Sequence, residues 1–145
     1  MKRIAFVAGG LVVLVAGIAI IGWMLPRDHK TSRTLRVKRA PAEVWPVVIQ
    51  ATQASSTPLE VLESVAPHRL VTRVTEAEKD FGGTWTIAIT PVPSGSAITI
   101  TEDGWVANPI FRVVSRLVIG HHATMDGILK KVAANLNEEA ALSGE

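Results

Sequence analysis

The hydrophobic pattern divides the chain into a wholly apolar N-terminal segment and an amphipathic remainder. Ile4 to Leu25 form an unbroken run of 22 residues without a charged side chain. A helix of that length spans roughly 33 Å, which is enough to cross a hydrocarbon core of about 30 Å. Trp23 suits the headgroup level near the end of the run, and Pro26 ends the helix. We therefore predict a transmembrane anchor over residues 1–26.

A cleaved signal peptide is the alternative for this segment. The apolar region of a signal peptide is typically about 7–15 residues long and ends in a site of small residues. The run here is longer, and residues 21–26 (Ile-Gly-Trp-Met-Leu-Pro) form a poor cleavage site. We therefore expect a single-pass protein of the inner (cytoplasmic) membrane.

Beyond the anchor, the pattern predicts a linker, one domain and a tail. Residues 27–33 are polar and basic, which is typical of a linker. Residues 34–137 carry the periodic apolar positions of a folded domain, and residues 138–145 are predicted to be a flexible tail. About 120 residues follow the anchor, which suffices for one hydrophobic core and not for two.

The first elements of the domain are predicted to be a strand and a helix. Thr34–Ala40 alternates between apolar and basic side chains, as a half-buried strand does. Pro41 and Glu43 suit the first turn of a helix that continues through Val48. Pro46 fits this helix only if it starts late or is kinked, because proline has no N–H to donate. Residues 51–58 are predicted to form a loop.

A period of two then predicts four strands. They span Leu59–Ala66, Leu70–Glu76, Thr84–Val92 and Ala97–Val106. The short connections between them favour antiparallel neighbours. In the third of these strands, alternate residues from Trp85 to Ile89 share an apolar face that another element must cover.

The predicted cover is the C-terminal part of the chain. From Phe111 onward, apolar residues recur at spacings of three, four or seven. This pattern predicts a short helix over Pro109–Ile119, a break near Gly120 and a long last helix that ends near Asn137. The order strand, helix, four strands and helix indicates an α+β fold, with an antiparallel sheet folded over the long C-terminal helix.

Charge is concentrated beside the anchor. Residues 27–39 contain six basic side chains and one acid, whereas residues 40–145 contain seven basic and twelve acidic ones. The positive-inside rule and the attraction of basic segments to the anionic cytoplasmic leaflet favour a domain on the cytoplasmic side. Lys2 and Arg3 favour a cytoplasmic N-terminus instead, and part of the basic stretch reads equally well as the outward face of a strand. The cytoplasmic side is favoured for the domain, with the opposite orientation as the alternative.

Composition excludes several kinds of chemistry. The chain has no cysteine, so it has no disulfide, no thiolate zinc site and no cysteine nucleophile. With 48% hydrophobic and 19% charged residues it is neither disordered nor a nucleic-acid-coating protein. It contains neither a G-x-S-x-G nucleophile elbow nor a phosphate-binding P-loop. We expect no metal, no cofactor and no nucleic-acid partner, and the sequence indicates no oligomeric state.

Three segments carry a resemblance to a known superfamily. They are residues 39–45 (Arg-Ala-Pro-Ala-Glu-Val-Trp), residues 101–112 (Thr-Glu-Asp-Gly-Trp-Val-Ala-Asn-Pro-Ile-Phe-Arg) and residues 120–129 (Gly-His-His-Ala-Thr-Met-Asp-Gly-Ile-Leu). The chain resembles the START-like superfamily, also called SRPBCC or polyketide cyclase/dehydrase and lipid-transport proteins. The last two segments resemble a small membrane-anchored bacterial branch of it. Over residues 33–137 the resemblance implies a helix-grip fold, a START-like antiparallel sheet wrapped around the last helix with an apolar cavity between them.

This resemblance implies a binding partner, a hydrophobic small molecule or lipid held in the cavity. The candidate lining residues are Trp85, Ile87, Ile89, Phe111, Val114, Val118, His122 and Met125. His122 falls on the apolar stripe of the last helix, where it would fix the polar end of a ligand or simply bond to a neighbour. Trp45, Trp85 and Trp105 would line the pocket or only pack in the core.

Two other functions remain open. The superfamily has more strands and a second short helix where this chain has only residues 51–58. A smaller sheet allows a collapsed cavity, and the protein would then be a non-enzymatic structural or interaction protein. A cyclase/dehydrase-type enzyme is the other alternative, with Glu102 or His122 as the acid or base. Glu102 shares a face with Ile98 and Ile100, where burial would raise its pKa; a water-exposed carboxylate at the rim of the strand is the alternative.

Overall fold

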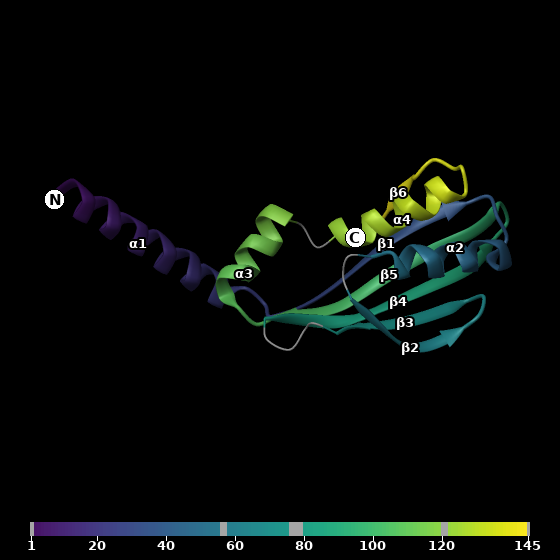
Figure 1. Ribbon diagram of the computed structural model, residues 1–145, viewed down its shortest axis with the longest axis horizontal. Coiled ribbons are helices and arrows are strands. Elements are labelled where there is room, and N and C mark those ends of the chain that lie inside the picture. Colours follow the sequence, from purple (N-terminus) through teal and green to yellow (C-terminus); the bar gives the residue numbers. More distant parts are fainter. Residues whose placement is uncertain (1, 56–57, 76–79, 120–121, 145) are drawn as a thin grey trace.

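A computed structural model describes the chain except residues 1, 56–57, 76–79, 120–121 and 145, and the side chains of residues 2–6, 8, 118 and 119. A long helix, α1 (Lys2–Met24), projects from a domain of one sheet and several shorter helices (Figure 1). Apolar side chains of α1 are exposed, including Val13 at 72% and Trp23 at 82%. Over the part of the chain that is described, none of the helices reaches the length and hydropathy of a membrane span.

The domain is an α+β unit, as predicted, with an antiparallel sheet. In chain order its elements are β1 (Asp28–Val37), α2 (Pro41–Gln53), β2 (Leu59–Val65), β3 (Arg69–Val74), β4 (Phe81–Val92), β5 (Gly95–Val106), α3 (Pro109–Val114), the π-helical turn η1 (Ser115–Ile119), α4 (Ala123–Asn135) and β6 (Leu142–Ser143). The described strands lie in the order β2-β3-β4-β5-β1-β6, and every neighbouring pair is antiparallel.

The hydrophobic core lies between the sheet and two helices. Helices α2 and α4 contact each other and cover the same face of the sheet (Figure 1). The sheet contributes Leu35, Val37, Leu70, Trp85, Ile87, Ile89, Ile98 and Ile100, and the helices contribute Val44, Val48, Ala51, Met125, Ile128, Leu129, Val132 and Ala133. Each of these side chains is at most 3% exposed. Beneath α4 the interior is therefore filled with side chains.

The last helix differs from the predicted long C-terminal helix. Helix α4 has 13 residues, the same number as α2, and β6 follows it. Residues 138–145 were expected to be a flexible tail, yet β6 pairs with β1 at Thr34 and Leu35. Leu142 is partly buried against the core, which is the physical reason that this short segment joins the sheet.

The start of the sheet also differs from the prediction. Strand β1 begins at Asp28 and pairs with β5 from Asp28 opposite Trp105 to Val37 opposite Ser96. Most of the expected linker at residues 27–33 is therefore part of the sheet. The hydrophobic pattern did not predict the first half of this strand, because the side chains that point inward there are polar. Helix α2 extends to Gln53 and takes up the first part of the expected loop at 51–58. It also keeps Pro46 within it, and the ring is exposed.

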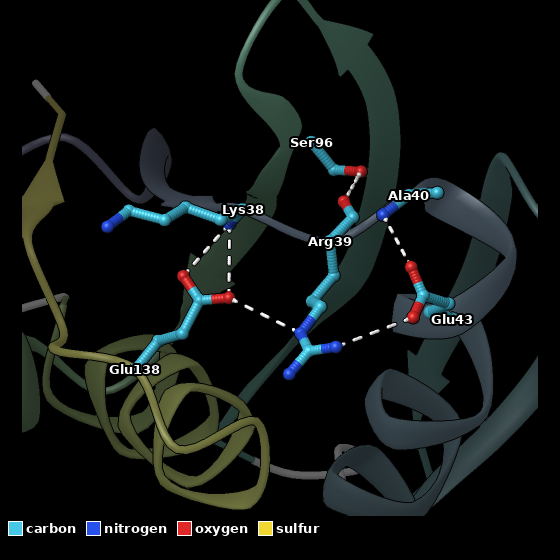
Figure 2. Close-up of polar contacts among 6 residues, drawn as sticks. All are labelled: Lys38, Arg39, Ala40, Glu43, Ser96 and Glu138. Atoms are coloured by element: carbon cyan, nitrogen blue, oxygen red, sulfur yellow. Dashed lines mark hydrogen bonds and ion pairs between the residues drawn. The ribbon is translucent and has the colours of Figure 1, made fainter.

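Polar contacts fix the corner where β1 meets α2 and the end of α4 (Figure 2). The Glu138 carboxylate accepts hydrogen bonds from the backbone N–H of Lys38 at 2.9 and 3.1 Å. Arg39 lies between Glu138 at 3.9 Å and Glu43 at 3.6 Å. The Ser96 hydroxyl donates to the Arg39 carbonyl at 2.6 Å. The corner thus joins segments that are about one hundred residues apart in the sequence.

Two buried polar atoms in the described core have no hydrogen-bond partner. They are the hydroxyl of Thr72 on β3 and the indole N–H of Trp85 on β4, which lie opposite each other in the sheet. Thr72 is fully buried, so its hydroxyl has lost its water without replacing it. Such a group costs about 1–3 kcal/mol of stability.

We predict that Thr72→Val stabilises the protein by about 1 kcal/mol, because a methyl group replaces the unpartnered hydroxyl at similar volume. Thr52→Val is the matched control, since the Thr52 side chain is also buried but its hydroxyl donates to the Val48 carbonyl at 2.8 Å. That change is expected to destabilise by about 1 kcal/mol. Denaturant unfolding of the full chain in detergent measures both. Equal losses in the two variants would contradict the prediction.

Candidate functional site

An apolar pocket lies at the end of the sheet near α3. Its volume is about 140 Å³. Its lining residues are His29, Val74, Phe81, Gly82, Trp85, Glu102, Trp105, Val106, Phe111 and Thr124. They come from the first residues of β1 and β4, the last residues of β3 and β5, from α3 and from the first turn of α4. The pocket therefore lies beside the filled core and not within it.

The volume limits what this pocket can hold. Sites for drug-sized ligands measure about 300–1,000 Å³, so this one is smaller. An engineered apolar cavity of about 150 Å³ binds benzene, which is the closest comparison in size. The pocket suits a single ring or a short acyl segment, and a larger lipid would leave most of its length outside. A depression of about 640 Å³ beside β1 is larger, but its lining contains no phenylalanine or tryptophan and includes Lys30, Ser32 and Arg116.

Two phenylalanine rings form one wall of the pocket. Phe81 begins β4 and Phe111 lies on α3, and their ring centroids are 5.8 Å apart. Asn108 positions α3 as its N-cap, because its side-chain oxygen accepts hydrogen bonds from the N–H groups of Ile110 and Phe111 at 2.9 and 3.1 Å. Phe81 is 40% exposed, so this wall reaches the surface.

A histidine and a carboxylate meet at the polar side of the pocket. His29 Nε2 lies 3.6 Å from Glu102 Oε1, and each side chain is about one-fifth exposed. Gly104 makes room for the imidazole, because a Cβ at this position would lie 2.9 Å from the His29 ring. A carboxylate beside an imidazole can bind the polar end of a ligand or exchange a proton with it.

The polar contacts continue along the inward face of β1. Thr31 Oγ1 lies 3.2 Å from His122 Nδ1, just before α4. Arg33 donates to both carboxylate oxygens of Asp126 in the first turn of α4, at 2.7 and 3.2 Å. The hydrogen bond from Arg33 lowers the pKa of Asp126 below its ordinary value, and the attraction between the two charges acts in the same direction against the opposing effect of burial. These contacts fix the start of α4 to β1.

Four of the residues singled out in the sequence line this pocket, and Trp105 is one of them. Trp85 and Phe111 form part of its apolar wall, and Glu102 lies on its polar side. The unpartnered indole N–H of Trp85 has less than 1 Å² of accessible surface, so it does not open into the pocket. His122 contacts Thr31 and is absent from the lining.

The other candidates lie elsewhere. Ile87, Ile89 and Met125 are at most 2% exposed within the filled core. Val114 is 36% exposed on the surface of α3, and the side chain of Val118 lies outside the described residues. Their contact with a ligand stays a prediction.

Sequence reasoning missed His29 and three of the apolar lining residues, Val74, Phe81 and Val106. For His29 the signal was available. Leu35 and Val37 mark the inward face of β1, and counting back in steps of two from Leu35 places Arg33, Thr31 and His29 on that same face. The apolar residues occupy strand ends, where alternation alone does not say which element will cover them.

No group of three His, Asp or Glu side chains that would hold a metal ion occurs in the described part of the chain.

Comparison with solved structures shows the fold. A conserved protein from Geobacillus kaustophilus matches with a TM-score of 0.59 at 12% identity, over 79% of this chain and 99% of its own. An HSP90 activator from Plasmodium falciparum matches with a TM-score of 0.53 at 10% identity, over 83% of this chain and 100% of its own.

The di-domain ARO/CYC protein StfQ from the steffimycin biosynthetic pathway has the same fold in part of its chain. It matches with a TM-score of 0.50 at 14% identity, over 74% of this chain and 50% of its own. These likenesses agree with the fold that the resemblance to START-like and polyketide-cyclase proteins implied. No protein-family profile matches the sequence, and no curated protein does either.

We predict that Asp126→Asn destabilises the protein by roughly 1 kcal/mol at neutral pH, because it removes a charge-assisted contact with Arg33. The folded-state pKa of Asp126 lies below the ordinary carboxyl value of about 3.9, so its contribution is complete above that value. The contribution is lost as the pH falls through the lowered pKa, and the two proteins should then converge in stability.

Unfolding of the full chain between acidic and neutral pH measures this difference. Glu139→Gln is the control, since Glu139 is exposed just beyond α4. A difference between wild type and Asp126→Asn that stays constant down to strongly acidic pH would argue against the Arg33 contact as its source.

Proposed function

We propose that this protein is a membrane-anchored module that binds a hydrophobic small molecule or lipid. The observation that carries the proposal is the apolar pocket of about 140 Å³, which is lined in part by Phe111 of α3, the helix that contacts α1. The bound portion is a ring or a short acyl segment, held by the wall of Phe81 and Phe111. The His29 and Glu102 pair contacts its polar end. The pocket lies at the end of the sheet, whereas the superfamily resemblance suggested the space beneath the last helix.

The apolar surface of α1 supports the membrane anchor. The apolar run from Ile4 to Leu25 is long enough to cross a bilayer. It includes residues before Val7, which is the first residue whose side chain is described. Val7, Val12 and Trp23 are 73%, 68% and 82% exposed. Apolar surface of this extent is unfavourable in water and marks a contact with lipid or protein. We place the protein in the inner membrane by this single helix, with its domain on the cytoplasmic side.

Anchoring and binding support each other physically. A hydrophobic ligand is concentrated in the bilayer, and a tether keeps the pocket within reach of that source. The fold likeness to StfQ, an ARO/CYC protein, is consistent with a small-molecule site on this scaffold. If the protein is instead an enzyme, this pocket would be its active site, with Glu102 as the acid or base and His29 as the neighbouring group.

A non-enzymatic interaction protein is the second candidate. Two observations favour it, the filled core beneath α4 and the fold likeness to an HSP90 activator that covers 83% of this chain. In that case the domain would bind a partner protein through its surface, and the pocket would hold no ligand. Ligand binding therefore discriminates between the two candidates.

We predict that toluene or hexanoate, as a ring probe and an acyl probe, raises the melting temperature of the full chain in detergent by binding the folded state. Thr124→Phe should abolish the increase, because Thr124 lines the pocket and is exposed enough to accept a ring without disturbing the core. Ala123→Phe is the matched control, since Ala123 is its exposed neighbour outside that lining.

Native mass spectrometry of the protein from nanodiscs would identify a co-purifying ligand. No increase with either probe, together with no bound molecule, would contradict ligand binding and favour the interaction protein.

We predict that the full chain stays with the membrane fraction after an alkaline carbonate wash. Because the chain has no cysteine, Lys131→Cys on the exposed side of α4 provides a single labelling site. A membrane-impermeant maleimide should label it in broken cells but not in intact spheroplasts. Labelling in intact spheroplasts would place the domain outside the cytoplasm, and release by carbonate would contradict the anchor.

A further inference from the structure

Helix α3 and the turn η1 carry an exposed apolar edge. Ile110, Val114 and Leu117 are 40%, 36% and 74% exposed. Their spacings of four and three residues place them along one side of the helical segment. Phe81 on β4 is also 40% exposed, and it packs on Phe111, the neighbour of Ile110 in α3. These four residues, Phe81, Ile110, Val114 and Leu117, are called the apolar edge below.

This segment is held against the end of α1. Gly22 of α1 meets the backbone of Pro109, so closely that a Cβ at position 22 would collide with it. Gly22 lies three positions before Leu25, the last residue of the apolar run. If α1 crosses a bilayer, the contact with α3 therefore lies at the level where the chain leaves the hydrocarbon.

Arg112 secures the same contact with hydrogen bonds. Its guanidinium donates to the carbonyls of Gly22 and Leu25 at 3.3 and 3.2 Å, at the C-terminal end of α1. It also donates to Val106 and Ala107, where β5 ends, at 2.7 and 2.9 Å. One side chain thus joins α1, α3 and the sheet. In Figure 1, α3 runs across the direction of α1.

Around the apolar edge, basic side chains (Arg27, Lys30, Arg112 and Arg116) outnumber the two acids, Asp28, which lines the same depression as Arg116, and Asp80, which precedes Phe81. Residues 109–119 contain two arginines and no acid. Arg116 is exposed and lines a depression together with Lys30, while Arg27 is exposed above the Trp105 ring at 4.9 Å. Basic side chains beside exposed apolar ones are the combination by which helices bind the interface of anionic membranes.

We propose that α3 and η1 form a second membrane contact, lying on the surface of an anionic phospholipid bilayer with the apolar edge inserted. This inference rests on the proposed anchoring by α1, which brings the segment to the interface. It extends that function, because Phe111 on α3 and Phe81 in the apolar edge also form a wall of the pocket. The pocket then opens at the lipid surface, and its ligand enters from the bilayer and not from the cytosol.

The experiment uses the full chain in vesicles of phosphatidylcholine and phosphatidylglycerol. Single cysteines labelled with an environment-sensitive dye are placed at Leu117→Cys and, on α1, at Val13→Cys. Val61→Cys is the matched control, because Val61 is an apolar residue that is 55% exposed on β2, away from α1 and α3 (Figure 1). Lipids with a nitroxide near the headgroup or deep in the acyl chain quench the dye according to its depth.

We expect the shallow nitroxide to quench the dye at residue 117 several-fold more than the dye at residue 61. The deep nitroxide should quench the dye at residue 13 most. Quenching at 13 without quenching at 117 would overturn the second contact and leave the anchor standing. Quenching at 117 but not at 13 would support the contact and contradict the anchor. In vesicles of phosphatidylcholine alone, Leu117→Cys should be quenched less, because the basic side chains lose their anionic partners.

Discussion

The helices that cover the sheet are much shorter than its longest strands. Strands β4 and β5 have 12 residues each, which corresponds to about 40 Å of extended chain. Helices α2 and α4 have 13 residues each, which corresponds to about 20 Å. A helical cover therefore reaches only about half of the inner face. The covered half is solid core, and the other half holds the polar contacts of β1, the pocket and α3.

The same difference in length explains why one half of the domain is a filled core and the other half holds the pocket. The filled half resembles the interior of any stable domain and leaves no room for a ligand. At the other half, apolar residues at the strand ends line the pocket: Val74 and Val106 are buried, whereas Phe81 beside α3 is 40% exposed. The pocket is the space that remains between Phe111 and these strand ends.

Hydrophobic periodicity was sufficient for most of the fold. The strands β2 to β5 and the helix after Pro41 follow from local patterns of apolar side chains, as do the apolar positions of α4. It failed at the start of β1, because the inward side chains there are His29, Thr31 and Arg33. These residues take their partners from Glu102, His122 and Asp126, more than seventy residues away in the sequence. Local patterning contains no information about such pairs.

The site was predicted only in part for a related reason. Trp85, Phe111 and Glu102 were recognised because they lie in phase with apolar neighbours, and all three line the pocket. Ile87, Ile89 and Met125 satisfy the same criterion but are buried in the core. Which of these inward-facing residues line a pocket depends on how far the covering helix extends over the sheet. That boundary is set by α4 beginning only at Ala123, and it is a property of the tertiary structure.

The Arg112 contacts have a mechanical consequence. A helix joined to its domain by a flexible linker can lean without moving the domain, but α1 has almost no such freedom. Its last carbonyls are bonded through one guanidinium to the end of β5, and Gly22 lies directly on Pro109. The axis of α1 and the plane of the sheet must therefore turn together. If α1 spans a bilayer as proposed, a thinner bilayer that tilts this helix would reorient the whole domain by the same angle.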